Sequence, residues 1–400
     1  KHDKINDILE RGVEEIIHKK HLETLLRGRK KLRVKLGIDP TSPNIHIGRA
    51  VVLWKLRAFQ DLGHQVVFIV GDFTGQIGDT SDKDAERPML SEDEIQKNLE
   101  TYFDQAYKIL IKDKTEVYYN STWLKDLGFA EIGKLANLFG MHEFSTRDNI
   151  AKRLKAGKRV SLRELLYPLM QGYDSVAVRA DVELGGTDQR FNLLAGRTIQ
   201  EAYGQKAQDV LMMELLEGTD GRKMSSSWGN TINLTDSAEI MFGKAMSVPD
   251  NLMDRYFKLA TKTRADHIEE LKKSYENPRD LKMILAHTIV EQYHGANAAR
   301  KAQEAFVSQF SKKELPSDIK EVKVKAGDYA LTDLLVKLNL VSSKSEAVRM
   351  ILQGGVKINQ QKISPETKGN SKSIVVPSVK IGTKNNLILQ VGKRKFIKIK

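Results

Sequence analysis

The stretch from Leu32 to Val70 constrains the fold of this 400-residue chain more than any other segment. Residues 32–38 are mostly β-favouring, and after a polar loop the apolar residues recur at helical spacing up to Gly63. Residues 66–70, Val-Val-Phe-Ile-Val, form an unbroken apolar run that is typical of a parallel strand buried on both faces. We therefore predict a strand, a helix and a second, parallel strand, with residues 39–49 as the loop that enters the helix.

A loop in this position is a common site for anionic ligands. It follows the carboxyl end of a strand, and the unpaired N–H groups of the next helix point out of it. We therefore expect a nucleotide phosphate here. His46 can donate a hydrogen bond to a phosphate oxygen, and Gly48 would let a purine or a ribose lie against the helix. Far downstream, Lys223 lies in a Ser-rich segment between glycines, from which it could reach a polyphosphate.

Two common nucleotide signatures are missing from the sequence. No G-x-G-x-x-G follows the first strand, and no G-x-x-x-x-G-K-[ST] occurs. This argues against dinucleotide oxidoreductases and P-loop enzymes. Each of the two candidates also has a simpler explanation. His46 and Gly48 could form a His-x-Gly by chance, and Lys223 could be a solvated lysine in a polar loop.

Strand and helix patterns alternate in the first half of the chain, which favours a doubly wound α/β body with a parallel sheet. The predicted elements around the first unit are helices over 1–30 and 91–111, a strand over 116–119, mixed helix over 120–153, a helix after 161, and a strand at 182–186 that runs into a glycine turn. Residues 218–229 are polar and rich in glycine and serine, which predicts a mobile loop. Residues 236–310 are helical in pattern, and residues 311–327 are typical of a linker.

The last part of the chain is strongly basic. Of the net charge of +13, residues 317–400 contribute +11, with 17 Lys and Arg against 6 Asp and Glu. This excess suggests a polyanionic partner, and nucleic acid is favoured over membrane because no cationic helix also carries a bulky apolar face. The alternative is a charged solubilising tail. Ser343 with Glu346 predicts a capping box, and Gly354-Gly355 the end of that helix.

Composition limits the compartment in which the chain works. Because there is no cysteine, neither disulfides nor thiolate metal sites can form, which fits a reducing environment. No apolar stretch approaches the roughly 20 residues that span a bilayer, and the first residues lack the apolar core of a signal peptide. We expect a cytoplasmic protein without a membrane partner.

Six motifs in a fixed order carry a resemblance to a known family. Residues 46–49, His-Ile-Gly-Arg, and 223–227, Lys-Met-Ser-Ser-Ser, are similar to the HIGH and KMSKS signatures of class I aminoacyl-tRNA synthetases. Within this class the chain resembles the bacterial-type tyrosyl-tRNA synthetases over essentially its whole length. The motifs are Gly37-Ile-Asp39-Pro-Thr41, Gly75-x-Ile-Gly-Asp79, Asn120-x-x-Trp123, Tyr167-x-x-x-Gln171-x-x-Asp174, Gly186-Thr-Asp188-Gln189 and the Lys223 segment.

The resemblance implies a two-step reaction. Tyrosine and ATP would form tyrosyl-adenylate and pyrophosphate, and the tyrosyl group would then pass to the 3′ end of tRNA(Tyr). Mg²⁺ would enter with ATP, and no metal site of the protein is expected. The family works as a homodimer, and DNA is not an expected partner.

The resemblance also assigns residues to sites. Asp174 would accept the phenolic hydroxyl of tyrosine, and Lys83 and Arg87 would close over pyrophosphate. His46 and Lys223 would stabilise charge on the phosphates. The implied tyrosine site is Asp79, Asn120, Tyr167, Gln171, Asp174 and Gln189. Within it Asp79, Tyr167 and Gln171 would hold the substrate ammonium, and Gln189 would orient the reacting carboxylate. The implied ATP site is Asp39, Thr41, His46, Gly48, Gly186, Asp188 and Lys223. The implied catalytic residues are His46, Arg49, Lys83, Arg87 and Lys223.

Three residues depart from the family pattern. Arg49 replaces the second histidine of the first signature, and Ser226 replaces the second lysine of the other. Lys35 stands where many members have a second tyrosine that binds the hydroxyl of the substrate. Arg49 keeps a hydrogen-bond donor and adds a fixed charge. Ser226 removes a mobile cation, so that Lys223 is the one lysine left in its motif.

The domain organisation follows from the same resemblance. A Rossmann-like catalytic domain with a dimer-interface insertion would cover 1–217, and the KMSKS-type loop 218–232. A helical anticodon-binding domain would cover 233–315, a linker 316–327, and an α+β RNA-binding domain similar to ribosomal protein S-four 328–400. In that last domain Lys344, Arg349 and Lys357 would contact tRNA phosphates. Two alternatives stay open: a tryptophanyl-tRNA synthetase, against which Asp174 argues, and a catalytically silent paralogue that binds RNA.

Overall fold

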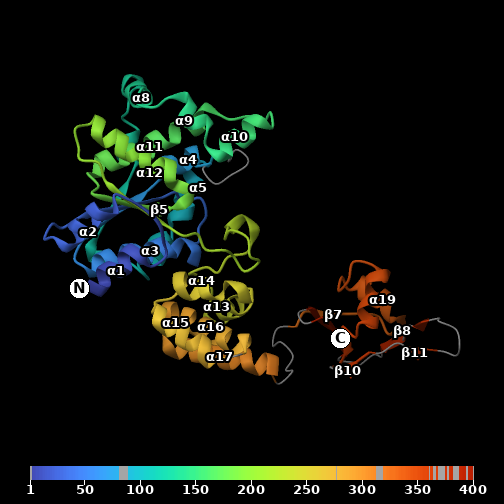
Figure 1. Cartoon of the computed structure of the whole chain (residues 1–400). Coiled ribbons are helices and arrows are strands. Elements are labelled where there is room, and N and C mark those ends of the chain that lie inside the picture. Colours follow the sequence, from blue (N-terminus) through green and yellow to red (C-terminus); the bar gives the residue numbers. More distant parts are fainter. Residues whose placement is uncertain are drawn as a thin grey trace. The chain divides into compact units, whose positions relative to one another are not determined.

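The chain forms two compact units, residues 1–306 and 307–400, each with a hydrophobic core of its own (Figure 1). We describe each unit by itself. The computed structural model describes residues 2–80, 89–275, 277–311, 319–359, 361–363, 366–367, 374–375, 378–381, 387–392 and 395–399.

The first unit is built on a six-stranded sheet with the strand order β1-β6-β5-β2-β3-β4. All neighbouring pairs are parallel except the edge pair β1 and β6. The predicted strand, helix and parallel strand are confirmed as β2, α3 (Ile47–Asp61) and β3. The strands are β1 (Val13–Ile17), β2 (Arg33–Ile38), β3 (Gln65–Val70), β4 (Thr115–Tyr119), β5 (Val182–Gly186) and β6 (Asp209–Met213).

The helix predicted over residues 1–30 is wrong in its middle part. Helix α1 (His2–Glu10) and helix α2 (Lys19–Arg27) flank strand β1, which pairs with β6. The chain leaves α1 through Gly12, whose φ of +64° suits glycine, and then enters a segment rich in β-branched residues. Pairing with the sheet therefore overrides the helical spacing of the apolar residues.

The predicted helix over 91–111 is also divided, into α5 (Glu92–Leu99) and α6 (Tyr102–Ala106). The break lies at Thr101, whose hydroxyl and carbonyl oxygens both accept hydrogen bonds from the side chain of Gln105. The mixed helix over 120–153 is confirmed as α7 (Ser121–Leu124), α8 (Phe129–Ala136), α9 (Met141–Ser145) and α10 (Asp148–Lys155).

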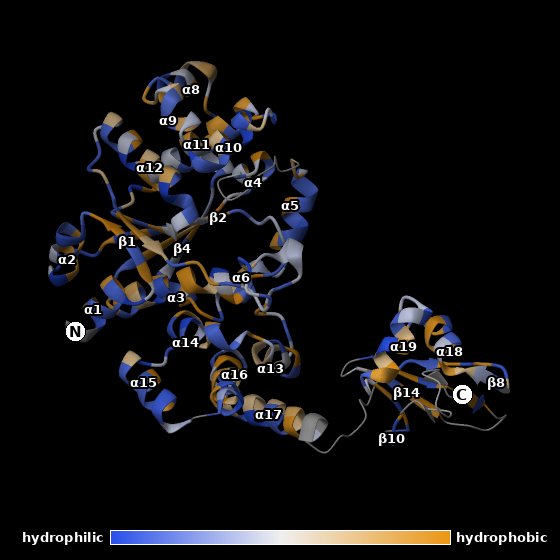
Figure 2. Ribbon diagram, turned by 45° about the vertical axis from the view of Figure 1, so that its right-hand side comes forward, coloured by the Kyte–Doolittle hydropathy of each residue, from blue (hydrophilic) through white to orange (hydrophobic). Residues whose placement is uncertain are grey.

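Helices cover both faces of the sheet (Figures 1 and 2). On one face, Val66, Phe68 and Val70 belong to the same core as Leu53 and Leu56 of α3. On the other face, the alternate residues of β3 pack with the end of α11 (Leu162–Val178), and α12 (Arg190–Ala202) covers β5 and β6. Burial on both faces explains why the parallel strands are continuous apolar runs.

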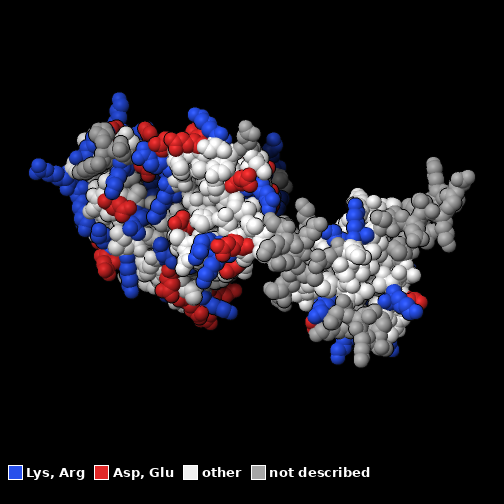
Figure 3. All heavy atoms as spheres, turned by 90° about the horizontal axis from the view of Figure 1, so that it is seen from below, with Lys and Arg blue, Asp and Glu red and all other residues white. Residues whose placement is uncertain are grey.

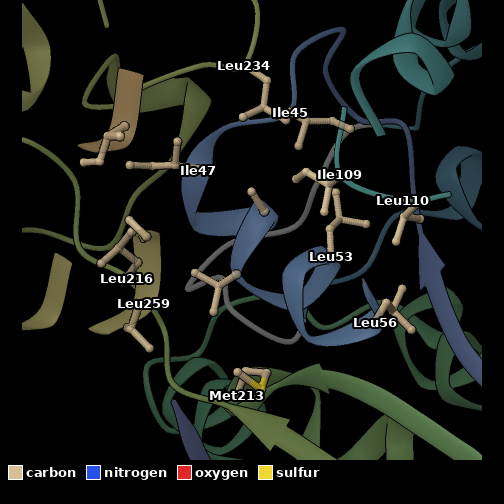
Figure 4. Packing of buried hydrophobic residues seen from close by; sticks show 14 of the residues in the cluster. Ile45, Ile47, Leu53, Leu56, Ile109, Leu110, Met213, Leu216, Leu234 and Leu259 are labelled. Atoms are coloured by element: carbon tan, nitrogen blue, oxygen red, sulfur yellow. The ribbon is translucent and has the colours of Figure 1, made fainter. Parts of the chain in front are cut away.

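The strand order reverses beside β2, because β2 lies between β3 and β5. The carboxyl ends of β2 and β5 therefore meet at the switch point of the sheet, where ligands bind in open α/β folds. The loop after β2 is fixed by residues 232–234, which are distant in the sequence. The N–H of Ile47 donates to the carbonyl of Ile232 at 2.8 Å, and the N–H of Leu234 donates to Ile45 at 2.9 Å. Figure 4 shows Ile45 and Leu234 next to each other, and Ile47 belongs to the same core.

After residue 234 the first unit is helical, as predicted. Helices α13 and α16 pack closely, and α14 packs on both α16 and α3. The helices are α13 (Ala238–Met246), α14 (Met253–Ala260), α15 (Ala265–Ser274), α16 (Pro278–His294) and α17 (Ala296–Ser311). Among the described residues, no helix is long and apolar enough to cross a membrane.

The second unit packs two helices, α18 (Leu331–Lys337) and α19 (Lys344–Leu352), with short strands. Its larger sheet has the order β10-β9-β14-β15-β7, and β8 pairs with β13. The strands are β7 (Glu321–Val322), β8 (Gly327–Ala330), β9 (Val356–Ile358), β10 (Gln361–Lys362), β11 (Glu366–Thr367), β12 (Ile374–Val375), β13 (Ser378–Ile381), β14 (Leu387–Val391) and β15 (Lys395–Ile399).

Two details of the second unit differ from the sequence prediction. Part of the expected linker, β7, is a strand that pairs in parallel with β15. The expected capping box is only half formed. The hydroxyl of Ser343 accepts from the N–H of Glu346, but the Glu346 carboxylate accepts from the N–H of Ser342 instead of Ser343. Helix α19 ends before Gly354-Gly355 as predicted.

A buried ion pair holds the segment next to Asp79. The guanidinium of Arg153 donates to both carboxylate oxygens of Glu164, at 2.5 and 2.8 Å, and both side chains are almost fully buried. Glu164 also accepts from the hydroxyl of Thr80 at 2.7 Å, and Asn149 donates to the carbonyl of Thr80.

We predict that Arg153→Leu lowers the free energy of unfolding of the first unit by about 3–5 kcal/mol, because the carboxylate of Glu164 loses its counter-charge while buried. Urea unfolding followed by tryptophan fluorescence measures the change. Arg27→Leu is the matched control, since Arg27 pairs with Glu23 at the surface and its loss should cost less than about 1 kcal/mol. Equal effects of the two variants would contradict the prediction.

Candidate active site

The residues predicted for the tyrosine and ATP sites, as far as the structure describes them, all line one cavity of about 540 Å³ at the carboxyl edge of the sheet. Lys83 and Arg87 lie outside the described residues. The lining residues that the sequence analysis had assigned are Asp39, Thr41, His46, Gly48, Arg49, Asp79, Asn120, Tyr167, Gln171, Asp174, Gly186, Asp188, Gln189 and Lys223. Their roles towards tyrosine and ATP stay predictions.

His46 begins helix α3 as its N-cap residue. Its Nδ1 accepts a hydrogen bond from the N–H of Arg49 at 3.3 Å, and its ring is nearly buried. Burial, followed by the charges of Arg49 and Lys223, lowers the pKa of His46 to about 3. The imidazole is therefore neutral near pH 7 and carries its proton on Nε2. It can donate a hydrogen bond to a phosphate oxygen as a neutral group, and its expected role towards the phosphates stays a prediction.

Arg49 supplies positive charge close to His46. Its guanidinium donates to the hydroxyl of Thr41 at 3.2 Å and to the hydroxyl of Tyr102 at 3.3 Å. Arg49 therefore extends across the loop of residues 39–46 and faces the cavity. The departure from the HIGH signature places a fixed cation among the residues assigned to the phosphates.

Lys223 is held by a partner, Asp188, that also lines the cavity. Its ammonium lies 2.9 Å from a carboxylate oxygen of Asp188, and both groups are partly exposed. The surrounding loop folds around Asn230, whose amide donates to the Lys223 carbonyl and to Asp220, and whose oxygen accepts from the N–H of Ser225. A ligand phosphate would have to compete with Asp188 for this lysine.

A chain of polar contacts crosses the floor of the cavity. Asp39 accepts hydrogen bonds from the hydroxyls of Tyr167 and Thr74, each at 2.7 Å, and Thr74 accepts from the amide of Asn120 at 2.9 Å. The carboxylate of Asp39 lies close to the backbone of Gly71. Only glycine fits at this position, since a Cβ there would lie 2.0 Å from that carboxylate. Tyr167, expected near the substrate ammonium, thus orients Asp39.

Two further predicted residues pair with each other. The amide of Gln189 donates to Asp79 at 2.6 Å. The expected roles divided them between the reacting carboxylate and the ammonium of the substrate. Their contact places a hydrogen-bonding amide and a carboxylate together at the same wall of the cavity.

Asp174 lies at the end of this chain and is almost fully buried. It accepts hydrogen bonds from the indole N–H of Trp123 at 2.8 Å and from Asn120 at 3.2 Å. Burial raises the pKa of Asp174 to about 7. The charge of Lys35 and the two hydrogen bonds oppose this rise, and the charge of Glu183 adds to it. A strong acceptor is thus held in an apolar setting, which suits the hydroxyl of a phenol.

Sequence reasoning missed several residues that line this site or support it from outside the cavity. Thr74 and Glu183 were not assigned, and Trp123 was quoted in a motif without a role. Thr74 immediately precedes the glycine of a recognised motif, and Glu183 is a carboxylate inside an apolar strand. The second of these was a usable signal, because a charge in a buried strand needs a partner.

The residues predicted to bind tRNA lie in the second unit. Arg349 is exposed on α19, and Lys357 is half-buried on β9. Lys344 is largely exposed and pairs with Asp333 at 2.7 Å. Figure 3 shows Lys and Arg on the visible face of this unit. In the described part of both units, no group of three or more His, Asp or Glu could hold a metal ion.

Comparisons with known proteins define the class of this fold and site. The family model of the class I tRNA synthetases (W and Y) matches residues 27–311, and the S4 domain model matches residues 331–368. The chain therefore belongs to the class I tRNA synthetase family of the W and Y type, and the S-four-like fold predicted for its last domain is confirmed.

Curated relatives narrow the comparison. The tyrosine–tRNA ligase of Thermotoga maritima is 47% identical over 98% of this chain and 96% of its own length. That of Shewanella oneidensis is 46% identical over 99% and 98%. Among solved structures, a truncated mitochondrial tyrosyl-tRNA synthetase of Coccidioides posadasii shares the fold with a TM-score of 0.62, 22% identity, and coverage of 76% of this chain and 91% of that chain. The tyrosyl-tRNA synthetase of Archaeoglobus fulgidus, complexed with L-tyrosine, has a TM-score of 0.59 and 21% identity. The match covers 76% of this chain and 99% of that chain.

We predict that Asp174→Asn gains stability relative to the wild type as the pH rises. The pKa of about 7 means that the native state keeps a proton which the unfolded chain releases near pH 3.8. The contribution of Asp174 to stability is thus complete below about pH 4 and is lost as the pH rises through 7. Asparagine does not titrate, so the free energy of unfolding, variant minus wild type, should increase by roughly 1–3 kcal/mol from pH 5 to pH 8.

Urea unfolding at each pH measures this difference. Asp104→Asn, which replaces an exposed carboxylate on α6, serves as the control and should change little over the same range. A difference for Asp174→Asn that stays flat with pH would contradict the prediction.

Proposed function

We propose that this chain is a tyrosine–tRNA ligase, which activates L-tyrosine with ATP and transfers it to the 3′ end of tRNA(Tyr). Identity of 46–47% with curated tyrosine–tRNA ligases over nearly the whole chain supports this function over a tryptophan enzyme. The observation that carries the proposal is structural: the buried acceptor Asp174 and the phosphate-facing residues His46 and Lys223 line the same cavity.

The proposed first step is an in-line attack of the tyrosine carboxylate on the α-phosphorus of ATP. One carboxylate oxygen forms the new P–O bond as the bond to pyrophosphate breaks, so no covalent intermediate with the protein is needed. ATP enters as its Mg²⁺ complex. Arg49 and Lys223 stabilise negative charge on the phosphates, and neutral His46 donates from Nε2.

Substrate tyrosine lies between the two ends of the floor network in this proposal. Its hydroxyl donates to Asp174, and its ammonium lies near Asp79, Tyr167 and Gln171. Asp39 and Gln189 orient the reacting carboxylate. Phenylalanine would leave the Asp174 carboxylate buried without this donor, which is unfavourable. In the second step the terminal ribose hydroxyl of tRNA attacks the adenylate and releases AMP.

We predict that the protein exchanges labelled pyrophosphate into ATP when tyrosine is present, and that Lys223→Ala lowers this exchange by roughly 100- to 1000-fold. The reason is the loss of a cation that acts on charge developing in the transition state. The assay is run with tyrosine, tryptophan and phenylalanine in parallel. Lys301→Ala, at an exposed position of α17, is the matched control and should exchange at the wild-type rate.

The same assay separates the proposal from its alternatives. Exchange with tryptophan instead of tyrosine would identify a tryptophan enzyme. No exchange with any amino acid, from protein that still binds tRNA in a filter assay, would favour the silent RNA-binding paralogue. An unchanged rate in Lys223→Ala would contradict the role of that lysine and leave the substrate assignment intact.

The domain boundaries given by the resemblance are part of this proposal, with a catalytic domain over 1–217 and an anticodon-binding domain over 233–315. In the S4 domain, Arg349 and Lys344 contact tRNA phosphates, which position the RNA without reading its sequence. We also propose a cytoplasmic location, which the absence of cysteine supports.

A homodimer is the proposed assembly. Large apolar side chains stand exposed on neighbouring helices next to the sheet: Phe129 on α8 is 94% exposed, Met141 on α9 63%, and Leu162 on α11 75%. Leu166 follows one turn after Leu162 and is also exposed. Exposed apolar side chains of this size are typical of a protein interface.

We predict that the double variant Phe129→Asp with Leu162→Asp is monomeric in light scattering at micromolar concentration, whereas the wild type has twice the 45.2 kDa mass of the chain. Charges on both side chains would oppose each other across a two-fold interface and lose water on association. Ile240→Asp, at an exposed position of α13, should leave the dimer intact. A monomeric wild type would contradict the prediction.

A further inference from the structure

Two charged side chains are fully buried where strands β2 and β5 pair. Lys35 and Glu183 are neighbours in register, and the Lys35 ammonium lies 2.9 Å from the Glu183 carboxylate. Both lie on the face of the sheet that α11 covers, because the residues on either side of each in its strand belong to the opposite core. A buried ion pair is weak support for stability, so its presence here calls for another explanation.

Both members of this pair contact helix α11. The ammonium of Lys35 donates to the carbonyl of Gln171 at 2.9 Å and to the hydroxyl of Ser175 at 2.7 Å. Glu183 accepts from the amide of Gln171 at 3.2 Å and from the hydroxyl of Ser175 at 3.1 Å. The pair thus fixes both the backbone and the side chain of Gln171 from the side of the sheet.

Helix α12 leaves room for this network. Gly196 faces Glu183, and a Cβ at this position would lie 3.3 Å from its carboxylate and 2.7 Å from the amide of Gln208, which also donates to Glu183. Glu183 is therefore satisfied from three sides by neutral donors and one cation. It does not line the cavity itself.

Asp174 immediately precedes Ser175 on α11, so it shares this environment. Its direct hydrogen-bond donors, Trp123 and Asn120, are uncharged. The charged and titratable groups that act on it come from the neighbouring elements: Lys35 on β2 favours its ionised form, and Glu183 on β5 opposes it. Tyr167 lies on α11 itself, where its hydroxyl donates to Asp39 and stays protonated because burial raises its pKa.

We propose that the Lys35–Glu183 pair is the positioning and charge-setting element of the tyrosine site: Lys35 keeps the carboxylate of Asp174 available to the phenolic hydroxyl, and the pair fixes Gln171. Lys35 thereby favours tyrosine over phenylalanine without contacting the substrate. This inference rests on the proposed function. It explains how a buried lysine can occupy a position at which many members of the family use a hydroxyl-binding tyrosine.

The test is the pH dependence of kcat/KM for tyrosine in pyrophosphate exchange, which reports groups of the free enzyme. Lys35→Met keeps the length of the side chain and removes its charge. The acid limb of its pH profile should move to higher pH by about one unit. The KM for tyrosine should rise roughly tenfold or more, and kcat should change less. The ratio of kcat/KM for tyrosine to that for phenylalanine should fall.

Glu183→Gln gives the opposite sign. It removes the charge that opposes ionisation of Asp174, so its acid limb should move to lower pH. The double variant, with a neutral pair, should return towards the wild-type limb. A purely structural role would weaken all three variants without opposite shifts. The titration of free tyrosine is common to all of them and cancels in the comparison.

Lys55→Met is the matched control. Lys55 on α3 is also buried, and it donates to three carbonyls at the end of α1, away from the tyrosine site. This variant should lose stability without moving the acid limb. Should Lys35→Met fail to fold, Glu183→Gln decides alone, because a shift to lower pH cannot arise from destabilisation.

The outcomes separate this inference from the function on which it rests. A wild type that exchanges with tyrosine, together with acid limbs and tyrosine-to-phenylalanine ratios unchanged in Lys35→Met and Glu183→Gln, would overturn the inference and leave the function standing. A wild type without tyrosine-dependent exchange would overturn both. Opposite shifts in the two single variants would support the inference.

Discussion

Two backbone hydrogen bonds hold the active site of this protein together. The segment 232–234 pairs with residues 45–47 through Ile232, Leu234 and their partners, so the chain that follows Lys223 is fixed to the start of α3. His46 and Lys223, which are far apart in the sequence, therefore face one cavity. Apolar contacts around Ile45 and Ile47 exclude water from these hydrogen bonds, which makes the junction costly to open (Figure 4).

The polar groups of the cavity behave as one network. Tyr167, Asp39, Thr74, Asn120 and Asp174 follow one another by hydrogen bonds across the floor. In a buried setting such a chain is rigid, because breaking any link leaves an unpaired polar atom. The two ends of the proposed tyrosine site are thereby held at a fixed separation. Selection of an amino acid then depends on the length and the polar tip of its side chain.

The sequence predicted the fold where the pattern was long and unambiguous. The unit from 32 to 70 has a buried strand, an amphipathic helix and a second buried strand, and all three were found. Strand β1 was missed because its apolar residues keep a helical spacing and its partner, β6, is distant in sequence. Motif order selected residues that line one cavity, whereas their mutual contacts could not be derived from the sequence. The neutral state of His46 depends on its burial in the folded chain and on the charges of Arg49 and Lys223, and Lys35 has its partner on a strand distant in sequence.

The buried charges of this protein are better explained by specificity than by stability. Lys35, Glu183 and Asp174 all lie where apolar residues of similar size would give a firmer core. Yet a carboxylate with only neutral donors around it would keep its proton near pH 7, and a protonated acid accepts a phenol less well. A nearby cation corrects this, but a cation inside the cavity would also attract the carboxylate of the substrate. A cation beneath the helix, with an anion to balance it, acts on Asp174 without adding a cation to the lining of the cavity beside Asp174.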